Sequence, residues 1–143
     1  MTAEADRFPD PSPAMADPPG LDTVFVADDL YALRASVAAH AGEFGLAEPG
    51  LGRLLVVATE LATNAIRHGG GRGRLRLWRQ DGAIYCEVSD DGPGIADTAA
   101  AGMQQVPLST EGGRGLWVVR QFTDEVRFTG RDPGIVITVK IQL

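Results

Sequence analysis

The stretch ELATNAIRH, residues 60 to 68, places a carboxylate, an amide and an imidazole at helical spacing. Glu60 to Asn64 and Asn64 to His68 are both steps of four residues, so in a helix the three side chains are neighbours. Glutamate and asparagine offer oxygen ligands, and Mg²⁺ binds oxygens, usually together with water and the phosphates of a substrate. Taken alone, the spacing is typical of the solvated face of an ordinary amphipathic helix, and the functional interpretation is a hard-cation site.

The rest of this helix indicates that its polar side is covered. At 100° per residue, the apolar side chains fill one arc, which is the face expected to pack on a sheet. This arc contains Leu54, Leu55, Ala58, Leu61, Ala62, Ala65 and Ile66. Val56 and Val57 instead point toward the polar side. A solvated face does not need two valines, so we expect another element to cover it.

Residues 90 to 94, DDGPG, follow a strand-like run in which Asp90 shares a face with Ile84, Cys86 and Val88. That phase turns the Asp90 carboxylate toward the core, where an unpaired charge is costly. The amino group of adenine is a suitable partner, and Gly92 and Gly94 would let a flat ring approach without a Cβ in the way. The alternative is a hairpin turn that Asp90 merely caps.

A third stretch, EGGRGLWVV at residues 111 to 119, leads three glycines directly into a helix. Backbone N–H groups at a helix N-terminus bind phosphate, and glycines let the phosphate come close. The stretch lacks the G-K-[ST] of a P-loop and is not followed by the parallel unit of a dinucleotide fold. A plain linker before a helix is the alternative.

Hydrophobic periodicity predicts the elements that must position these residues. The expected strands are 21–26, 74–78, 83–90, 125–128 and 135–141, and the expected helices are 30–44, 49–68 and 115–122. Gln80-Asp81-Gly82 predicts a hairpin. The order predicts an α+β fold, a two-layer sandwich with a mixed, mostly antiparallel sheet and helices on one face.

Length and composition narrow the class of protein. The chain has 143 residues, which suits one domain, here 21–143, after a proline-rich tail at 1–20 that we expect to be disordered. A net charge of −6 disfavours direct nucleic-acid binding, and the lone Cys86 excludes an internal disulfide. The sequence contains neither a secretory signal nor a run long enough to cross a membrane, so we predict a cytoplasmic protein.

Taken together and in order, the three stretches resemble the motifs of the Bergerat (GHKL) ATP-binding fold. Gyrase, heat-shock chaperones, histidine kinases and mismatch-repair ATPases share this fold. ELATNAIRH is similar to its N-box, DDGPG to its D-x-G-x-G box and GRGL to its second glycine box. Within the histidine kinase-like ATPases, a short stand-alone chain with the pattern E-L-x-T-N-A-x-x-H resembles the anti-sigma-factor serine/threonine kinases, and so does the ending GRGLWVVRQFTDEV.

This resemblance implies that ATP and Mg²⁺ bind. It assigns Glu60 as the catalytic carboxylate, Asn64 as the Mg²⁺ ligand and Asp90 as the partner of the adenine amino group. It places a nucleotide lid at about 95–112. The nucleotide-binding residues that it implies are Asn64, His68, Asp90, Gly92, Gly94, Ile95, Gly113, Arg114, Gly115 and Leu116.

The function implied by the resemblance is an ATP-binding regulator. It would transfer the γ-phosphoryl group of ATP to a serine or threonine of an antagonist protein and would sequester a sigma factor. A non-catalytic, ATP-gated protein-binding module and a stand-alone ATPase are the alternatives. The expected partners are ATP or ADP and a sigma factor or its anti-sigma antagonist, without nucleic acid or membrane. Relatives of this kind are often homodimers, and the sequence does not decide this.

Overall fold

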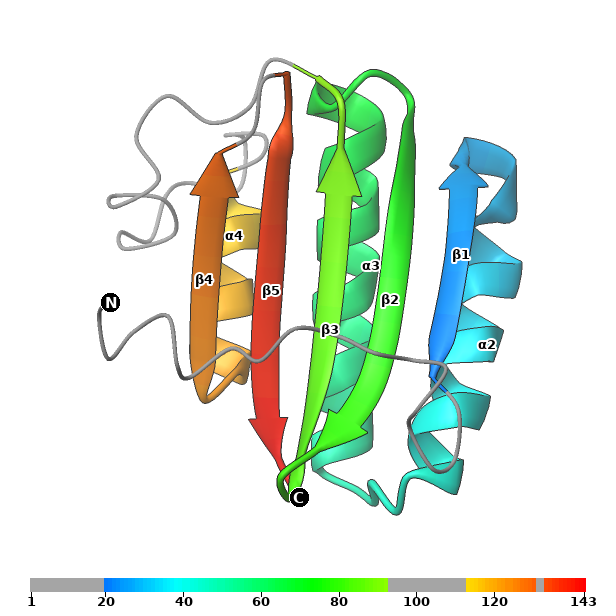
Figure 1. Ribbon diagram of the computed structural model, residues 1–143, viewed down its shortest axis with the longest axis vertical. Coiled ribbons are helices and arrows are strands. Elements are labelled where there is room, and N and C mark those ends of the chain that lie inside the picture. The colour runs from blue at the N-terminus through cyan, green and yellow to red at the C-terminus, as the bar shows by residue number, and fades with distance from the viewer. Residues whose placement is uncertain (1–19, 93–112, 131–132) are drawn as a thin grey trace.

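A computed structural model of the chain describes residues 20–92, 113–130 and 133–143 (Figure 1). The predicted order of strands and helices is confirmed. The elements are β1 (Leu21–Val26), η2 (Ala27–Asp29), α2 (Leu30–Glu43), α3 (Gly50–His68), β2 (Arg72–Gln80), β3 (Ala83–Asp90), α4 (Gly113–Phe122), β4 (Glu125–Gly130) and β5 (Ile135–Gln142). The tail predicted at 1–20 lies outside the described residues, apart from Gly20. Among the described helices, none is both long and apolar enough to cross a lipid bilayer.

The sheet has the strand order β1-β2-β3-β5-β4, and neighbouring strands are antiparallel throughout the described part. β3 and β4 are both antiparallel to β5, so they run in the same direction on either side of it (Figure 1). The last strand of the sequence therefore occupies an inner position. The connection from β3 through α4 to β4 passes over this inserted strand.

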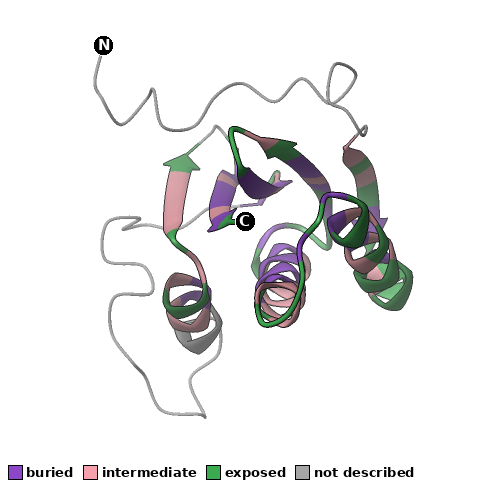
Figure 2. Ribbon diagram, turned by 90° about the horizontal axis from the view of Figure 1, so that it is seen from below, coloured by how far each residue is buried: buried purple, intermediate pink, exposed green. Residues whose placement is uncertain are grey.

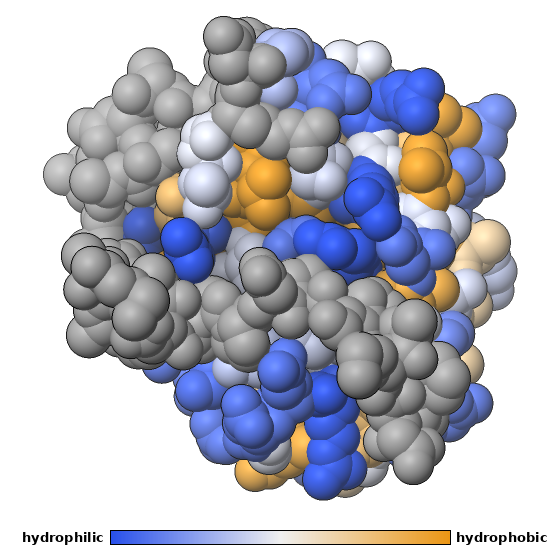
Figure 3. Space-filling view, in the orientation of Figure 1, coloured by the Kyte–Doolittle hydropathy of each residue, from blue (hydrophilic) through white to orange (hydrophobic). Residues whose placement is uncertain are grey.

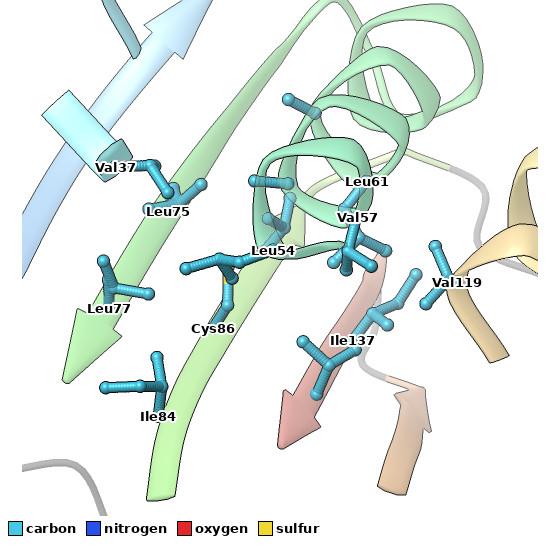
Figure 4. Close-up of a cluster of buried hydrophobic side chains, with 14 of the residues drawn as sticks. Val37, Leu54, Val57, Leu61, Leu75, Leu77, Ile84, Cys86, Val119 and Ile137 are labelled. Atoms are coloured by element: carbon cyan, nitrogen blue, oxygen red, sulfur yellow. The ribbon is translucent and has the colours of Figure 1, made fainter. Parts of the chain in front are cut away.

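The helices α2, α3 and α4 all lie on one face of the sheet (Figure 2). The predicted α+β fold, a two-layer sandwich, is therefore confirmed. Alternate strand residues point toward the helices and form the core with the apolar face of α3. Figure 4 shows part of this core, to which the sheet contributes Leu75, Leu77, Ile84, Cys86 and Ile137, and α3 contributes Leu54, Val57 and Leu61.

The expectation that another element covers α3 holds for one of its two valines. Val57 is fully buried, and Figure 4 shows Val119 of α4 pointing toward it and toward Ile137 of β5. Val56 is only partly buried. The element beside α3 is thus α4, which follows the second glycine stretch. This packing carries the N-terminal end of α4 to the side of α3 that bears Asn64.

The face of the sheet away from the helices carries hydrophilic side chains with smaller hydrophobic areas between them (Figure 3). Arg74 donates hydrogen bonds of 2.8 and 2.6 Å to the Asp22 carboxylate, which hold the pKa of Asp22 below its ordinary value of 3.8. Both side chains are well exposed, so this pair stabilises the fold little. Trp78 and Tyr85 stack on the same face with ring centroids 5.4 Å apart.

Candidate functional site

A cleft of about 740 Å³ opens between the C-terminal half of α3, the start of α4 and the adjoining ends of β3 and β5. Its walls are mainly apolar, with a few polar side chains among them. This composition is typical of a small-molecule site. The lining residues are Leu61, Asn64, Ala65, Ile66, Arg67, His68, Gly70, Gly71, Val88, Asp90, Leu116, Ile135 and Ile137.

The cleft brings together residues from all three sequence stretches. Asn64 and His68 come from α3, Asp90 from the end of β3 and Leu116 from the first turns of α4. These positions are far apart in the sequence and meet only because α3 and α4 pack side by side over β3 and β5. Glu60 is half-buried one helical turn before Asn64, and it is not among the lining residues.

Asn64 carries a buried polar atom that invites a ligand. Its Nδ2 is shielded from solvent and has no hydrogen-bond partner among the described residues. A buried amide group without a partner costs free energy of about 1–3 kcal/mol. Because the two ends of an asparagine amide are assigned rather than observed, the same position can present the carbonyl oxygen to a cation. The side chain therefore fits a Mg²⁺ ligand that works together with nucleotide phosphates.

Asp90 combines both interpretations of the DDGPG stretch. It is the last residue of β3, opposite Ile135 of β5, and it lines the cleft on the helix side of the sheet. Its Oδ1 also accepts a 2.9 Å hydrogen bond from the backbone N–H of Gly92. The carboxylate thus caps the turn and faces the cleft. A carboxylate offers about four acceptor positions, so one carboxylate can accept hydrogen bonds from a turn and from a ligand amino group at the same time.

Two glycines beside Asp90 were missed by sequence reasoning. A Cβ at Gly69 would lie 2.3 Å from Cγ of Asp90, and a Cβ at Gly134 would lie 1.9 Å from its backbone oxygen. Gly134 also has a φ of +109°, a conformation that favours glycine. Gly69 belongs to a run of three glycines that predicts only the end of α3. No local signal marks its contact with Asp90 at the end of β3.

The second glycine stretch enters the helix earlier than predicted. α4 begins at Gly113 and not at Gly115, so both of these glycines belong to its first turn. Leu116 is buried and lines the cleft, which brings the N-terminal end of α4 toward Asn64 and Asp90. The side chain of Arg114 is outside the described part of the structure. So are Gly94, Ile95 and the whole lid predicted at 95–112.

Two further titratable side chains lie in or near the cleft, those of His68 and Cys86. His68 is exposed at the end of α3 and borders the cleft. Cys86 is fully buried on β3, and burial raises the pKa of its thiol from 9.0 to about 12. Among the described residues, His, Cys, Asp and Glu form no group of three that could hold a metal. The cation expected here would have Asn64 as its protein ligand.

The chain matches the model of the histidine kinase-like ATPase domain over residues 26–141. Because this match spans most of its length, the chain belongs to the family of histidine kinase-like ATPase domains and has the GHKL fold. The family is one of ATP-binding domains, so membership supports binding of ATP by this chain. No curated protein matches the sequence.

Several solved structures have a similar fold. The RsbU and RsbW domains of Rv1364c from Mycobacterium tuberculosis superpose with a TM-score of 0.65 at 17% identity, covering 87% of this chain and 32% of that one. Full-length ShkA in complex with AMPPNP superposes with a TM-score of 0.57 at 22% identity, covering 83% of this chain and 31% of that one. The mycobacterial sensor histidine kinase MprB superposes with a TM-score of 0.55 at 17% identity, covering 85% of this chain and 97% of that one. The chain spans about a third of the length of the first two, and the likeness concerns the fold.

Proposed function

We propose that this protein is an ATP-dependent serine/threonine kinase of the anti-sigma-factor type. The observation that carries the proposal is the single cleft that gathers Asn64, Asp90 and the start of α4. Asp90 accepts a hydrogen bond from the adenine amino group, and Asn64 ligates Mg²⁺. The N–H groups of the first turn of α4 donate hydrogen bonds to the phosphates. When bound, Mg²⁺ neutralises phosphate charge.

In the proposed reaction, the hydroxyl oxygen of a serine or threonine attacks the γ-phosphorus of ATP. The bond between that phosphorus and the β–γ bridging oxygen breaks, and ADP leaves. Glu60 takes the proton of the hydroxyl group. It stands one turn, about 6 Å along the axis, before Asn64 on the same side of α3. This position beside the cleft suits a group that acts on the incoming acceptor and not on the nucleotide.

The proposed acceptor is a serine or threonine of an antagonist protein, and a sigma factor is the partner that the kinase sequesters. The motif resemblance supports this assignment, as does the presence of an RsbW domain among the structures of similar fold. The exposed side of α2 leaves surface for such a partner beyond the cleft.

Transfer from ATP labelled at the γ-phosphate into proteins of a cell extract from the source organism tests this proposal. Acid-stable phosphoserine or phosphothreonine is expected with the wild type. Glu60→Gln should reduce labelling by roughly 10²–10⁴-fold while ATP affinity measured by calorimetry stays the same. Glu43→Gln, an exposed site at the end of α2, is the matched control and should label normally.

The same experiment separates the alternatives. If the protein binds ATP but transfers nothing, an ATP-gated binding module replaces the kinase. If ADP and free phosphate accumulate without labelled protein, the protein is an ATPase. Acid-labile label on histidine would instead indicate a histidine kinase.

A further inference from the structure

Three glycines from three separate segments converge on Asp90. Gly69 follows α3, Gly92 lies in the turn after β3, and Gly134 precedes β5. A Cβ at Gly92 would come within 2.3 Å of Cα of Gly69, so these two glycines are packed against each other. The carboxylate is therefore seated in a space that exists only because the surrounding backbone carries no side chains.

Gly69 is the glycine that contacts the carboxylate itself. A Cβ there would lie 2.3 Å from Cγ of Asp90, 2.5 Å from its Oδ2 and 2.6 Å from the backbone oxygen of Ala65. Such separations are far below van der Waals contact, so one of the groups must move when a methyl group is added. The Ala65 oxygen already accepts a 2.9 Å hydrogen bond from the Gly69 N–H, which ties it to the helix end. The Asp90 carboxylate, which accepts the N–H of Gly92, ends a side chain that can rotate, whereas the Ala65 oxygen belongs to the backbone, so we expect the carboxylate to move.

We propose that Gly69 is a positioning residue that sets the selectivity of the site for adenine, by fixing where the Asp90 carboxylate meets the base. The inference rests on the proposed role of Asp90. A hydrogen bond to the base depends on distances within a few tenths of an ångström. The phosphates are held elsewhere, at Asn64 and the start of α4. Moving the carboxylate therefore weakens recognition of the base and leaves phosphate binding intact.

Calorimetric titration with Mg-ATP and Mg-ITP tests this inference, because inosine carries a carbonyl oxygen where adenine carries its amino group. The wild type should prefer ATP by roughly tenfold or more, as expected for a hydrogen bond to a charged group. In Gly69→Ala the ratio should fall toward that of Asp90→Asn through loss of ATP affinity, while ITP affinity stays within about twofold of the wild type.

Two glycine variants control for the added methyl group. Gly42→Ala on α2 meets nothing within 4 Å, so it should leave stability and selectivity intact. Gly73→Ala is also crowded, since its Cβ would lie 2.6 Å from Cζ of Phe25, and its nearest atoms belong to Phe25 and Ala65 rather than to Asp90. It should lower the melting temperature and keep the preference for ATP. A Gly69→Ala protein that keeps the ATP preference, or that loses ATP and ITP equally, overturns the inference.

Gly69→Ala also has to fold for this comparison. If it does not, the double variant Gly69→Ala/Asp90→Ala decides, because it removes the carboxylate that the methyl group would strike. Recovery of folding in the double variant supports the contact with Asp90. Continued failure identifies the Ala65 oxygen as the cause and overturns the inference. A wild type that binds neither nucleotide overturns the proposed function, and the inference falls with it. If the wild type binds ATP and ITP equally, the role of Asp90 in base recognition is overturned, and the inference falls with it. The proposed kinase function is not overturned by that result.

Discussion

The backbone N–H of Gly92 donates a hydrogen bond of 2.9 Å to the Oδ1 of Asp90, so the residue that faces the cleft also closes the turn beside it. A hydrogen bond of this kind between an aspartate and the residue two positions later stabilises a tight turn. Any variant at Asp90 therefore changes two things, and the choice of replacement decides which of them is measured.

Asp90→Asn is expected to separate these two roles. Asparagine keeps an oxygen that can accept the N–H of Gly92, but its amide is neutral. We expect ATP affinity to fall by roughly 10- to 100-fold, as for the loss of a hydrogen bond to a charged group, with little change in melting temperature. Calorimetry and thermal unfolding measured on the same samples check this.

Asp90→Ala removes the turn hydrogen bond as well and should destabilise the fold by about 1 kcal/mol in addition to abolishing ATP binding. If Asp90→Asn bound ATP like the wild type, the carboxylate would be only a turn cap.

Asn64→Ala should remove the Mg²⁺ dependence of ATP binding. Wild-type affinity is expected to drop when Mg²⁺ is chelated, whereas the variant should bind equally weakly with and without the cation. Because Nδ2 of Asn64 is buried without a hydrogen-bond partner among the described residues, removing it should cost little stability. Thr63→Ala is the matched control, because Thr63 precedes Asn64 on α3 and does not line the cleft. A variant that retained the full response to Mg²⁺ would contradict the assignment of Asn64.

Leu61→Ala and Leu54→Ala should have similar effects on stability and different effects on binding. Both side chains are buried on α3, so each truncation should lower the free energy of unfolding by about 2–5 kcal/mol. Only Leu61 lines the cleft, so only Leu61→Ala should also weaken ATP binding. Urea unfolding with and without ATP measures both quantities. Equal loss of ATP affinity in the two variants would mean that binding follows overall stability.

The buried thiol of Cys86 should make the fold less stable in mild alkali. Its pKa is about 12 in the folded chain against an ordinary 9.0, because burial disfavours the thiolate and the nearby Glu87 adds to the effect. The unfolded thiol loses its proton first, so the contribution is complete below pH 9 and is lost as the pH rises toward 12. The free energy of unfolding should fall by about 1 kcal/mol between roughly pH 8 and 10 from this group alone.

Urea unfolding of the wild type and Cys86→Ala at both pH values measures the contribution of this thiol to the free energy of unfolding. Burial also raises the pKa of Tyr85, but that residue is present in both proteins. The slope with pH should be shallower in Cys86→Ala, and identical slopes would contradict the assignment. The native wild type should also resist iodoacetamide until it unfolds, since thiolate is the reactive form.

The strands and helices could be predicted from the sequence because each shows a local hydrophobic periodicity. The apolar arc of α3 and the alternating residues of β3 place Asn64 and Asp90 without knowledge of any partner. The start of α4 was predicted two residues late, because glycine disfavours helices and only tertiary packing extends the helix back to Gly113. Gly69 and Gly134 could not be assigned a role, since the need for glycine arises from Asp90, a residue distant in sequence.

The inner position of β5 determines when during synthesis the cleft can exist. β3 has only β2 as a neighbour until Ile135–Gln142 emerges from the ribosome, and β4 has none, because both pair with β5. The contacts between β3 and β5 join segments far apart in the chain, and such contacts are the slowest to form. Gly134 takes its place beside Asp90 in the same step. Nucleotide cannot assist the earlier stages of folding, because it stabilises only a fold that already contains its site.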